Sequence, residues 1–423
     1  MMTEQGRPED VLEHIGPGTD VIVPIQFGEP ATLLDTLEGH AWELDGVRIH
    51  RMDPFHERAY IHGEFGDHLR HVDYFLGPGS RKAYWAGNCD LVPNHFSEMP
   101  LLLRRTAPRP IVLAAASLPD EHGYFSLGTN ADYTCAFIGE VPFFLEATPH
   151  MPRTFGQNQV HMSQLAGWCR TELELPDVHP SEPDERDHAI AAAIAGRIAD
   201  GSCLQVGVGK VPDALLAALA GHRDLGVHTE ALSDGIMRLI DKGVITGTRK
   251  HQYRNKHVAT FCVGSRKMQR WLHNNAAVSM LPVDWVNDPR VVAREPNFVS
   301  INATSEVDLM GQAASETIAG KYWSSSGGQA DFARGAMYSE NGQAFLVLHS
   351  ATSSGQSRIN VTLTPGSVVT TLKNTIDHVV TEYGIASLRG RSLADRAQAL
   401  IAIAHPEHRE RLSREARASG LLH

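Results

Sequence analysis

One segment, residues 185–235, constrains the fold more than any other part of the sequence. It opens with a helical stretch that carries Ile190, Ile194 and Ile198 at four-residue spacing. Ser181 is placed to cap this helix at its start, and Gly201 is placed to end it. The capping residue, the apolar spacing and the terminal glycine therefore all predict one amphipathic helix.

The rest of the segment alternates between strand-like and helix-like runs. Residues 202–209 form a short apolar run typical of a buried strand, and residues 225–232 form a second one. Between them, a helix is expected to open at Pro212 and to end at Gly221. Helix, strand, glycine turn, helix and strand in this order predict a parallel sheet with helices packed outside it.

The chain length predicts two domains, because 423 residues exceed what one hydrophobic core usually supports. The clearest change in composition is at 171–188, where three prolines lie among acidic residues and interrupt regular structure. We therefore expect an N-terminal domain over 1–180 and a C-terminal domain over 181–423. Both have α/β texture, with further strands expected in four segments: 19–27, 109–128, 345–352 and 378–384.

Composition excludes several classes of partner. The formal net charge is -11 and no run of Lys and Arg reverses it locally, so nucleic acid is not expected as a partner. No apolar stretch approaches the ~20 residues that cross a bilayer, so no membrane partner is expected either. The five cysteines contain no C-x-x-C pair, and the histidines are dispersed. These features predict a cytoplasmic protein without a metal.

The first candidate for chemistry is the turn Q-V-G-V-G-K-V-P at 205–212, between a strand and a helix. Its glycines let the backbone approach a ligand, and the helix N-terminus offers N–H donors to an anion. A dinucleotide-binding turn is an alternative, since Glu230 follows at about the distance of a ribose-binding acid. However, Pro212 replaces the third glycine of that motif, and Leu204 stands where a phosphate-binding loop needs glycine. A dinucleotide-dependent oxidoreductase is therefore disfavoured.

Three further segments carry candidate residues with open alternatives. In H-T-E-A-L-S-D-G (228–235), Glu230 lies where an α/β sheet places its ligand, but a capping or salt-bridged acid has the same spacing. The small residues of 324–335 could form a backbone nest or a flexible turn. In 380–390, Glu382 and Arg389 could form a structural ion pair or a site. Spacing alone does not decide among these.

Together these segments resemble the acetyl-CoA hydrolase/transferase family, which includes acetate and 4-hydroxybutyrate CoA-transferases. In the C-terminal half the similar stretches, in the family's order, are LQVGVGKVPDALLAAL, LGVHTEALSDGIMRLIDKGVITG, LPVDWVNDP, VSINATSEVDLMGQ, GGQADFARGA, VVTEYGIASLRG and RAQALIAIAHPEHR. In the N-terminal half they are NHFSEMPLLLRR, LPDEHGYFSLGTNADYT and MPRTFGQNQVHMS, while most of 1–85 does not match. The resemblance implies two CoA-transferase-like (NagB/RpiA-type) open α/β domains with mainly parallel sheets.

The resemblance also implies roles for individual residues. Glu230, in the H-T-E motif, is implied as the nucleophile. The residues implied around the reacting carbonyl are Val208 and Gly328, through their backbone N–H groups, with Asn302 and Glu382. Those implied at coenzyme A are Gly207, Gly209, Gly327 and Lys267. Glu306 competes for the nucleophile role but is interpreted as structural.

One segment departs from the family pattern. Relatives often carry a lysine in S-x-A-K-x-G that helps to hold the CoA phosphates, whereas this chain reads S-A-T-S-S-G at 350–355. Arg358, Lys267 and Arg266 are the candidates to replace that cation.

The activity that the resemblance implies is CoA transfer between an acyl-CoA and a small carboxylic acid, through a glutamyl-CoA thioester. Hydrolysis of acyl-CoA on the same site is one alternative, and a non-catalytic CoA-binding protein is another. Acyl-CoA and small carboxylates are the expected partners, with neither a metal nor a redox cofactor. A homodimer is expected from the relatives.

Overall fold

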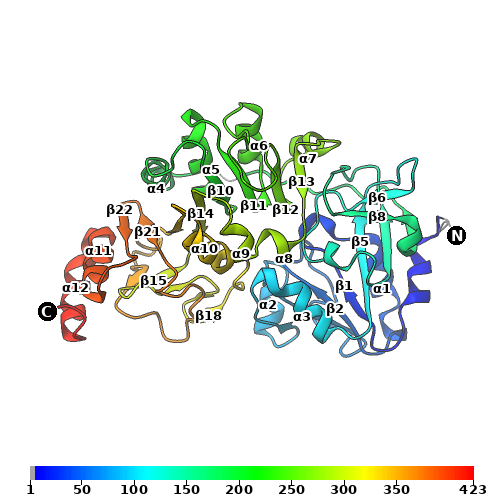
Figure 1. The fold of residues 1–423 in the computed structure, drawn as a ribbon. Coiled ribbons are helices and arrows are strands. Elements are labelled where there is room, and N and C mark those ends of the chain that lie inside the picture. The colour runs from blue at the N-terminus through cyan, green and yellow to red at the C-terminus, as the bar shows by residue number, and fades with distance from the viewer. Residues whose placement is uncertain (1–4, 181) are drawn as a thin grey trace. The chain divides into compact units, whose positions relative to one another are not determined.

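The computed structural model describes residues 5–180 and 182–423, and it has a mixed α/β fold with large, mainly parallel sheets, as predicted (Figure 1). The chain divides into two compact units. Unit 1 comprises Met1–His179 and Val258–Val286, and unit 2 comprises Pro180–His257 and Asn287–His423. Segment 258–286, which the sequence assigns to the C-terminal domain, thus belongs to unit 1. Bridges between Asn130 and Phe261 and between Gly156 and Met280 attach it there.

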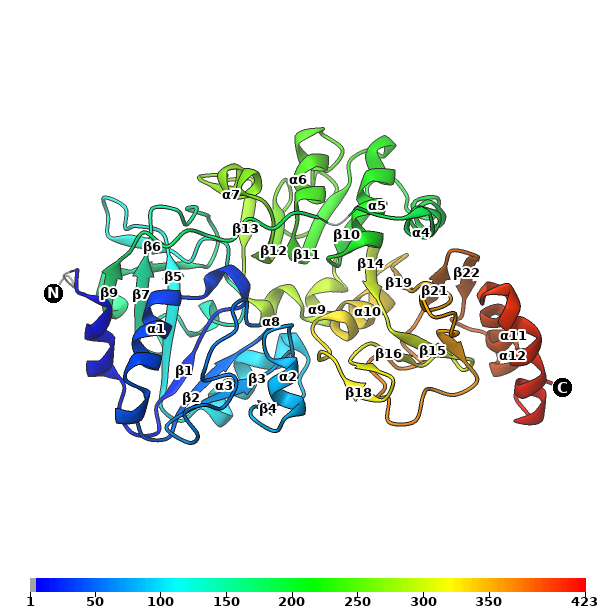
Figure 2. The same cartoon turned by 180° about the vertical axis from the view of Figure 1, so that it is seen from behind.

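Unit 1 is built on a parallel sheet with the strand order β4-β3-β2-β1-β5-β7-β9. Figure 2 shows β5, β7 and β9 side by side in this sheet. The strands expected in 19–27 and 109–128 are present as β1 and β5, and every β5 residue after Pro110 is buried. The strands are β1 (Asp20–Ile22), β2 (Val47–Arg51), β3 (Leu69–Asp73), β4 (Asp90–Leu91), β5 (Pro110–Ala116), β7 (Phe143–Ala147) and β9 (Leu165–Arg170).

The other elements of unit 1 are short. The helices before residue 180 are α1 (Ala31–Gly39), α2 (Arg81–Trp85) and α3 (Met99–Thr106), with 3-10 turns at Pro8–His14, Gln26–Gly28, Ala41–Glu43, Phe96–Glu98, Cys135–Phe137 and Met162–Gln164. Strands β6 (Tyr124–Ser126) and β8 (Gln159–His161) pair with each other antiparallel. The later segment carries β12 (His257–Cys262), α7 (Arg266–Leu272), β13 (Val278–Met280) and α8 (Val283–Val286).

Unit 2 contains the strand order β11-β10-β14-β19-β21-β22, in which only the β21–β22 pair is antiparallel. The strands are β10 (Cys203–Val206), β11 (Gly226–Leu232), β14 (Phe298–Ala303), β19 (Gln343–Val347), β21 (His378–Thr381) and β22 (Gly384–Ser387). The four strands predicted over 202–209, 225–232, 345–352 and 378–384 are confirmed. Because they are parallel, their carboxyl ends lie at one edge of the sheet.

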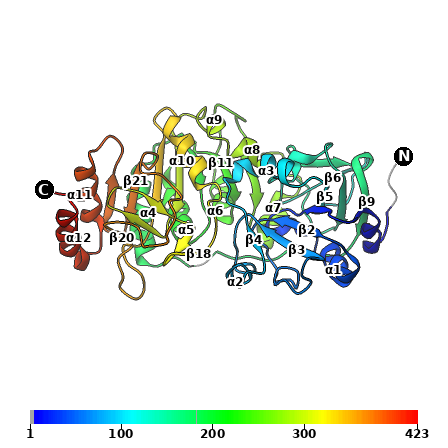
Figure 3. The same cartoon turned by 90° about the horizontal axis from the view of Figure 1, so that it is seen from below.

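Helices and small strand pairs complete unit 2. The helices are α4 (Glu185–Ala195), α5 (Lys210–Ala218), α6 (Asp234–Asp241), α9 (Pro289–Val292), α10 (Gln329–Tyr338), α11 (Leu393–Ile403) and α12 (Pro406–Ala418), with a 3-10 turn at Leu219–Gly221. The small strands are β15 (Glu306–Asp308), β16 (Ala313–Ala314), β17 (Thr317–Ile318), β18 (Lys321–Tyr322) and β20 (Ile359–Asn360). Figure 3 shows α11 and α12 together beside β21, where they share one buried apolar cluster.

The first predicted helix is shorter than the sequence suggests. Ser181, its predicted cap, lies outside the described residues, and Asp184 is the N-cap, accepting from the N–H groups of Arg186 and Asp187. The helix ends at Ala195 with Gly196 as its C-cap. The prediction that it continues to Gly201 is wrong, because glycine at 196 weakens the helix and the next residues turn more tightly, Ile198 donating to Ala195.

None of the helices in the described residues is long and apolar enough to cross a membrane.

Candidate active site

Glu230 lies in the second half of β11, and its residue is only partly exposed. Its Oε2 accepts a hydrogen bond of 2.7 Å from Nδ2 of Asn287. Burial raises the pKa of Glu230 to about 7, while the hydrogen bonds from Asn287 and from the Gly328 backbone act in the opposite direction. The carboxyl group is therefore poised between its charged and neutral forms near neutral pH.

Gly328 is the N-cap of α10, and its missing side chain makes room for Glu230. A Cβ at this position would lie 2.0 Å from Glu230 Oε2 and 2.3 Å from Asn287 Nδ2. The carboxylate thus approaches the N-terminal end of a ten-residue helix, where the helix dipole favours negative charge. Of the two readings that the sequence left open for 324–335, the backbone nest fits this geometry.

Asn287 is the site residue that the sequence interpretation missed. Its side chain is fully buried, and its Oδ1 has no hydrogen-bond partner among the described residues. The residue directly precedes Asp288, which caps α9 by accepting from the N–H of Arg290. The signal was present in the stretch LPVDWVNDP, where a polar residue stands ahead of a capped, proline-started helix.

The glycine turn after β10 holds Gly207, Val208 and Gly209. The N–H of Gly207 donates to the carbonyl of Ile301, which fixes the turn against β14. Val208 is 61% exposed, and Gly209 is the N-cap of α5 with φ 134, a conformation that other residues rarely adopt. The turn therefore presents its middle residue outward at a helix start.

Asn302, at the end of β14, is fully engaged with its neighbours. Its Nδ2 donates to Gln205 Oε1 and to Ser300 Oγ, both at 3.0 Å, and its Oδ1 accepts from Gln205 Nε2 at 3.1 Å. Gln205 lies in β10, two residues before Gly207, so this paired amide system joins the ends of two adjacent strands. Gln205 is a further residue to which the sequence interpretation gave no role.

Glu382 follows β21 and is bound by the loop that follows β19. Its carboxylate accepts from the N–H of Ser350 at 2.9 Å and from Ser350 Oγ at 2.7 Å. Arg358 lies close enough for its charge to interact with Glu382, and its N–H donates to the Ser350 carbonyl. The alternative ion pair with Arg389 is wrong, because the guanidinium of Arg389 instead lies 3.7 Å from Asp377.

Glu306, interpreted as structural, accepts hydrogen bonds from Asn360 and from the N–H and hydroxyl of Thr364. These contacts tie β15 to the chain around β20. Gly327 has φ 53, in the left-handed region that favours glycine. This conformation shapes the turn that places Gly328 at the start of α10.

Lys267 and Arg266, the other candidates to replace the family lysine at the CoA phosphates, lie in α7, which belongs to unit 1. Lys267 is exposed there. Arg266 donates to Glu174 at 2.6 Å, and its backbone N–H donates to Asp177. Of the candidates for the missing family lysine, only Arg358 belongs to unit 2, the unit that holds Glu230.

The structure therefore brings some predicted site residues into contact and separates others. Glu230 and Gly328 touch directly, with Asn287 completing the group. Gly207, Val208, Asn302 and Glu382 lie at or just after the carboxyl ends of β10, β14 and β21, at the ligand-binding edge of the same sheet. A partly buried carboxylate that meets one amide donor and one backbone donor is suited to nucleophilic catalysis at a carbonyl.

Comparison with known proteins identifies the family of the chain. Residues 264–416 match the family model described as acetyl-CoA hydrolase/transferase C-terminal domain. The chain is 38% identical over 417 residues to succinyl-CoA:cyclohexane-1-carboxylate CoA transferase of Geobacter metallireducens, covering 97% of this chain and 94% of that protein. It is 37% identical to 4-hydroxybutyrate coenzyme A transferase of Clostridium kluyveri, covering 96% of each.

Solved structures give the same result. RipA from Yersinia pestis superposes with a TM-score of 0.93 at 31% identity, covering 99% of this chain and 98% of that chain. Full-length similarity at these levels of identity shows a shared family as well as a shared fold. The chain therefore belongs to the acetyl-CoA hydrolase/transferase family of CoA-transferases.

Proposed function

We propose that the protein transfers coenzyme A between an acyl-CoA and a small carboxylic acid, with Glu230 as the covalent nucleophile. The observation that carries the proposal is the placement of the partly buried Glu230 carboxylate against Asn287 Nδ2 and the Gly328 end of α10. A site of this kind holds a carboxylate ready to attack and offers donors for the negative charge that develops.

The first half of the reaction loads the enzyme. Glu230 Oε1 attacks the acyl carbonyl carbon, the carbon–sulfur bond breaks, and an acyl-glutamyl anhydride and CoA thiolate form. The thiolate then attacks the Glu230 carbonyl carbon, and the bond to the acyl carboxylate breaks. The products are a glutamyl-CoA thioester and the first free acid.

The second half repeats these steps in reverse with the acceptor acid. Its carboxylate attacks the glutamyl carbonyl carbon and expels CoA thiolate. The thiolate attacks the acyl carbonyl of the new anhydride, which forms the new acyl-CoA and returns the Glu230 carboxylate. Splitting the exchange in this way replaces one difficult substitution by easier acyl transfers.

Asn287 and Gly328 have a specific part in this scheme. Both contact Oε2, so Oε2 is the oxygen that stays as the carbonyl oxygen of the glutamyl intermediates. The same donors then face the oxyanion that forms when thiolate or acid attacks Glu230, each worth roughly 2.7–4 kcal/mol in comparable sites. The N–H of Val208 is proposed as the donor for the substrate carbonyl, since that residue is the exposed middle of its glycine turn.

The remaining assignments are part of the same proposal. Gly207, Gly209 and Gly327 let the backbone pass close to the pantetheine arm of CoA, while Lys267 or Arg358 supplies a cation for its phosphates. Asn302 and Glu382 shape the sheet edge next to the reacting group. The scheme uses neither a metal nor a redox cofactor, and we propose that the protein works as a cytoplasmic homodimer.

The decisive experiment separates transfer from hydrolysis. CoA release from acetyl-CoA and longer acyl-CoAs is measured with and without added carboxylates, and the glutamyl-CoA adduct is trapped and mapped by mass spectrometry. Acceptor-dependent turnover with an adduct on Glu230 supports transfer, whereas acceptor-independent release supports hydrolysis. Wild-type activity in Glu230→Ala would rule out the nucleophile assignment.

A further inference from the structure

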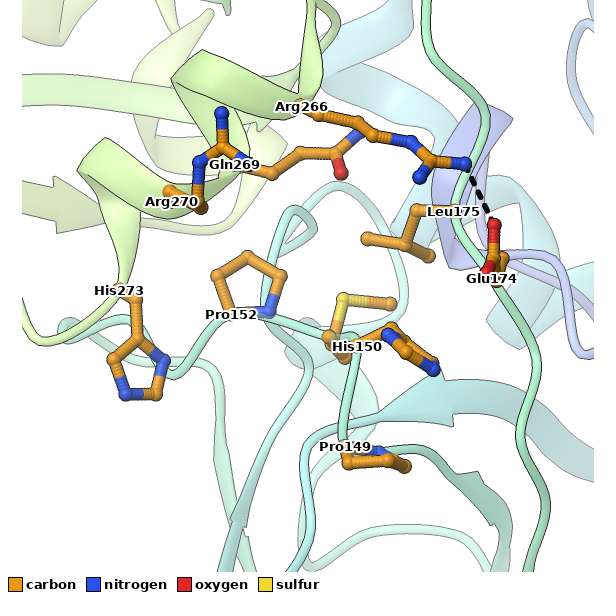
Figure 4. Close-up of a pocket in the computed structure, with 10 residues that line it drawn as sticks. Pro149, His150, Pro152, Glu174, Leu175, Arg266, Gln269, Arg270 and His273 are labelled. Atoms are coloured by element: carbon orange, nitrogen blue, oxygen red, sulfur yellow. Dashed lines mark hydrogen bonds and ion pairs between the residues drawn. The ribbon is translucent and has the colours of Figure 1, made fainter.

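Unit 1 contains a cavity of about 350 Å³ that the proposed reaction does not use (Figure 4). Its lining comes from the loop after β7, the chain after β9 and one face of α7, all within unit 1. The lining residues are Pro149, His150, Met151, Pro152, Glu174, Leu175, Arg266, Gln269, Arg270 and His273. The volume lies within the range of small-molecule sites, roughly 300–1,000 Å³.

The position of the cavity in the fold favours ligand binding. Strands β7 and β9 are parallel neighbours, and both lining segments follow their carboxyl ends. This is the edge at which open α/β sheets place their ligands.

The roof of the cavity is a polar stripe on α7. Arg266, Gln269 and Arg270 lie at helical spacing of three and four residues, which places them on one helix face, and His273 is the C-cap residue directly after Leu272. Met268 and Leu272 are buried on another face and anchor the helix to unit 1. The helix thus keeps a cationic stripe over the cavity while its apolar side packs in the core.

The floor of the cavity is apolar. Met151 and Leu175 are buried and belong to one hydrophobic cluster with Ala115. Pro152 is also buried, and Figure 4 shows it between the α7 residues and the loop at Pro149. A ligand in the cavity therefore meets hydrocarbon on one side and charged or amide groups on the other.

The charges around the cavity leave one cation without a partner. Arg266 is neutralised by Glu174 at 2.6 Å, as the dashed line in Figure 4 marks. His150 lies 3.8 Å from Glu172, and Nδ1 of His273 accepts from the N–H of Arg153. In contrast, Arg270 forms no hydrogen bond or ion pair with any described residue. The site therefore has one uncommitted positive charge beside an apolar floor.

We infer that this cavity binds an amphipathic monocarboxylate, with the carboxylate at Arg270 and the hydrocarbon body against Met151, Pro152 and Leu175. One free guanidinium matches one carboxylate, and the floor excludes ligands without an apolar body. Acids of this class are also reactants of the proposed transfer, so the site would sense them. That link to metabolism rests on the proposed function, whereas the binding site does not.

The test uses the full-length protein without any CoA thioester, so its outcome is independent of catalysis. Hexanoate, acetate and hexylammonium are titrated while the methyl resonance of Met151 is followed by NMR, with Met151→Leu to assign the signal. Hexanoate is expected to shift this resonance saturably, acetate more weakly, and hexylammonium not at all. An unchanged Met151 signal, or equal binding of hexylammonium, would overturn the inference.

Charge variants complete the test. Arg270→Glu is expected to weaken hexanoate binding about tenfold or more, because a charge-assisted contact becomes repulsive. Arg270→Lys should retain most of the affinity, and Arg105→Glu, on an exposed position of α3, controls for net charge. Equal weakening by Arg270→Glu and Arg105→Glu would also refute the assignment. Failure to trap an adduct on Glu230 would contradict the transferase proposal but would not affect the hexanoate-binding result.

Discussion

The side-chain amide of Asn287 donates a hydrogen bond of 2.7 Å to Oε2 of Glu230, joining two residues that are 57 positions apart in the chain. Gly328 closes on the same oxygen from the start of α10. Three segments from separate parts of the sequence therefore hold the Glu230 carboxylate. Substitutions in these segments should have measurable effects.

Replacing Asn287 by alanine should reduce kcat by about 10²–10³-fold, the usual effect of losing one oxyanion donor. Loss of its hydrogen bond should also move the pKa of Glu230 further above about 7, since that bond favours the carboxylate. Steady-state kinetics over a range of pH measure both effects. Asn360→Ala is the matched control, because Asn360 makes a comparable bond to Glu306. Similar losses in both variants would contradict the role of Asn287.

Replacing Gly328 by alanine should remove at least about 99% of the activity without unfolding the protein. The new Cβ would lie 2.0 Å from Glu230 Oε2, so the carboxylate must leave its position. Adduct formation on Glu230, followed by mass spectrometry, reports this directly, and circular dichroism verifies the fold. Gly221→Ala, whose added Cβ meets nothing within 4 Å, should behave like the wild type. Normal adduct formation in Gly328→Ala would show that the contact is dispensable.

Activity should rise with pH through an apparent pKa near 7. Only the carboxylate form of Glu230 attacks, and burial raises the pKa of this group to about 7. The pH dependence of kcat/KM reports ionisation in the free enzyme and therefore measures this value. A profile that is flat between pH 5.5 and 8.5 would argue against a raised pKa at the nucleophile.

The raised pKa of Glu230 also predicts that the folded protein becomes less stable as pH rises, whereas its activity increases. Because the folded pKa of Glu230 is above the model value of 4.5, the folded protein binds this proton more tightly than the unfolded chain. Stability from this group is therefore present at low pH and is lost as pH rises from about 4.5 to about 7. The loss is at most about 3 kcal/mol. Denaturant unfolding of the wild type and Glu230→Gln at pH 5 and pH 8 should show a larger pH effect in the wild type.

Replacing Asn302 by alanine should act mainly through the packing of the sheet edge. Both N–H groups and the carbonyl of this side chain are bonded to Gln205 or Ser300. Their loss should lower the free energy of unfolding by about 1–3 kcal/mol, since the Nε2 of the buried Gln205 loses its acceptor while its Oε1 keeps only the bond from Ser300. Urea unfolding measures this. If kcat falls more than about tenfold while stability is unchanged, Asn302 instead acts directly on the substrate.

The sequence by itself determined the α/β class, the strands around 202–209, 225–232, 345–352 and 378–384, and the family. Apolar runs, glycine turns and motif order are local, so they can be read without knowing what packs against them. Only the tertiary structure decided which residues that are distant in the sequence contact one another. The stretch LPVDWVNDP shows Asn287 only as a polar residue ahead of a helix, and the fold alone makes it a contact of the nucleophile. Likewise, the spacing of Glu382 and Arg389 suggested an ion pair, but Ser350 and Asp377 are nearer in space. The pKa of Glu230 also depends on burial, which many distant residues produce together.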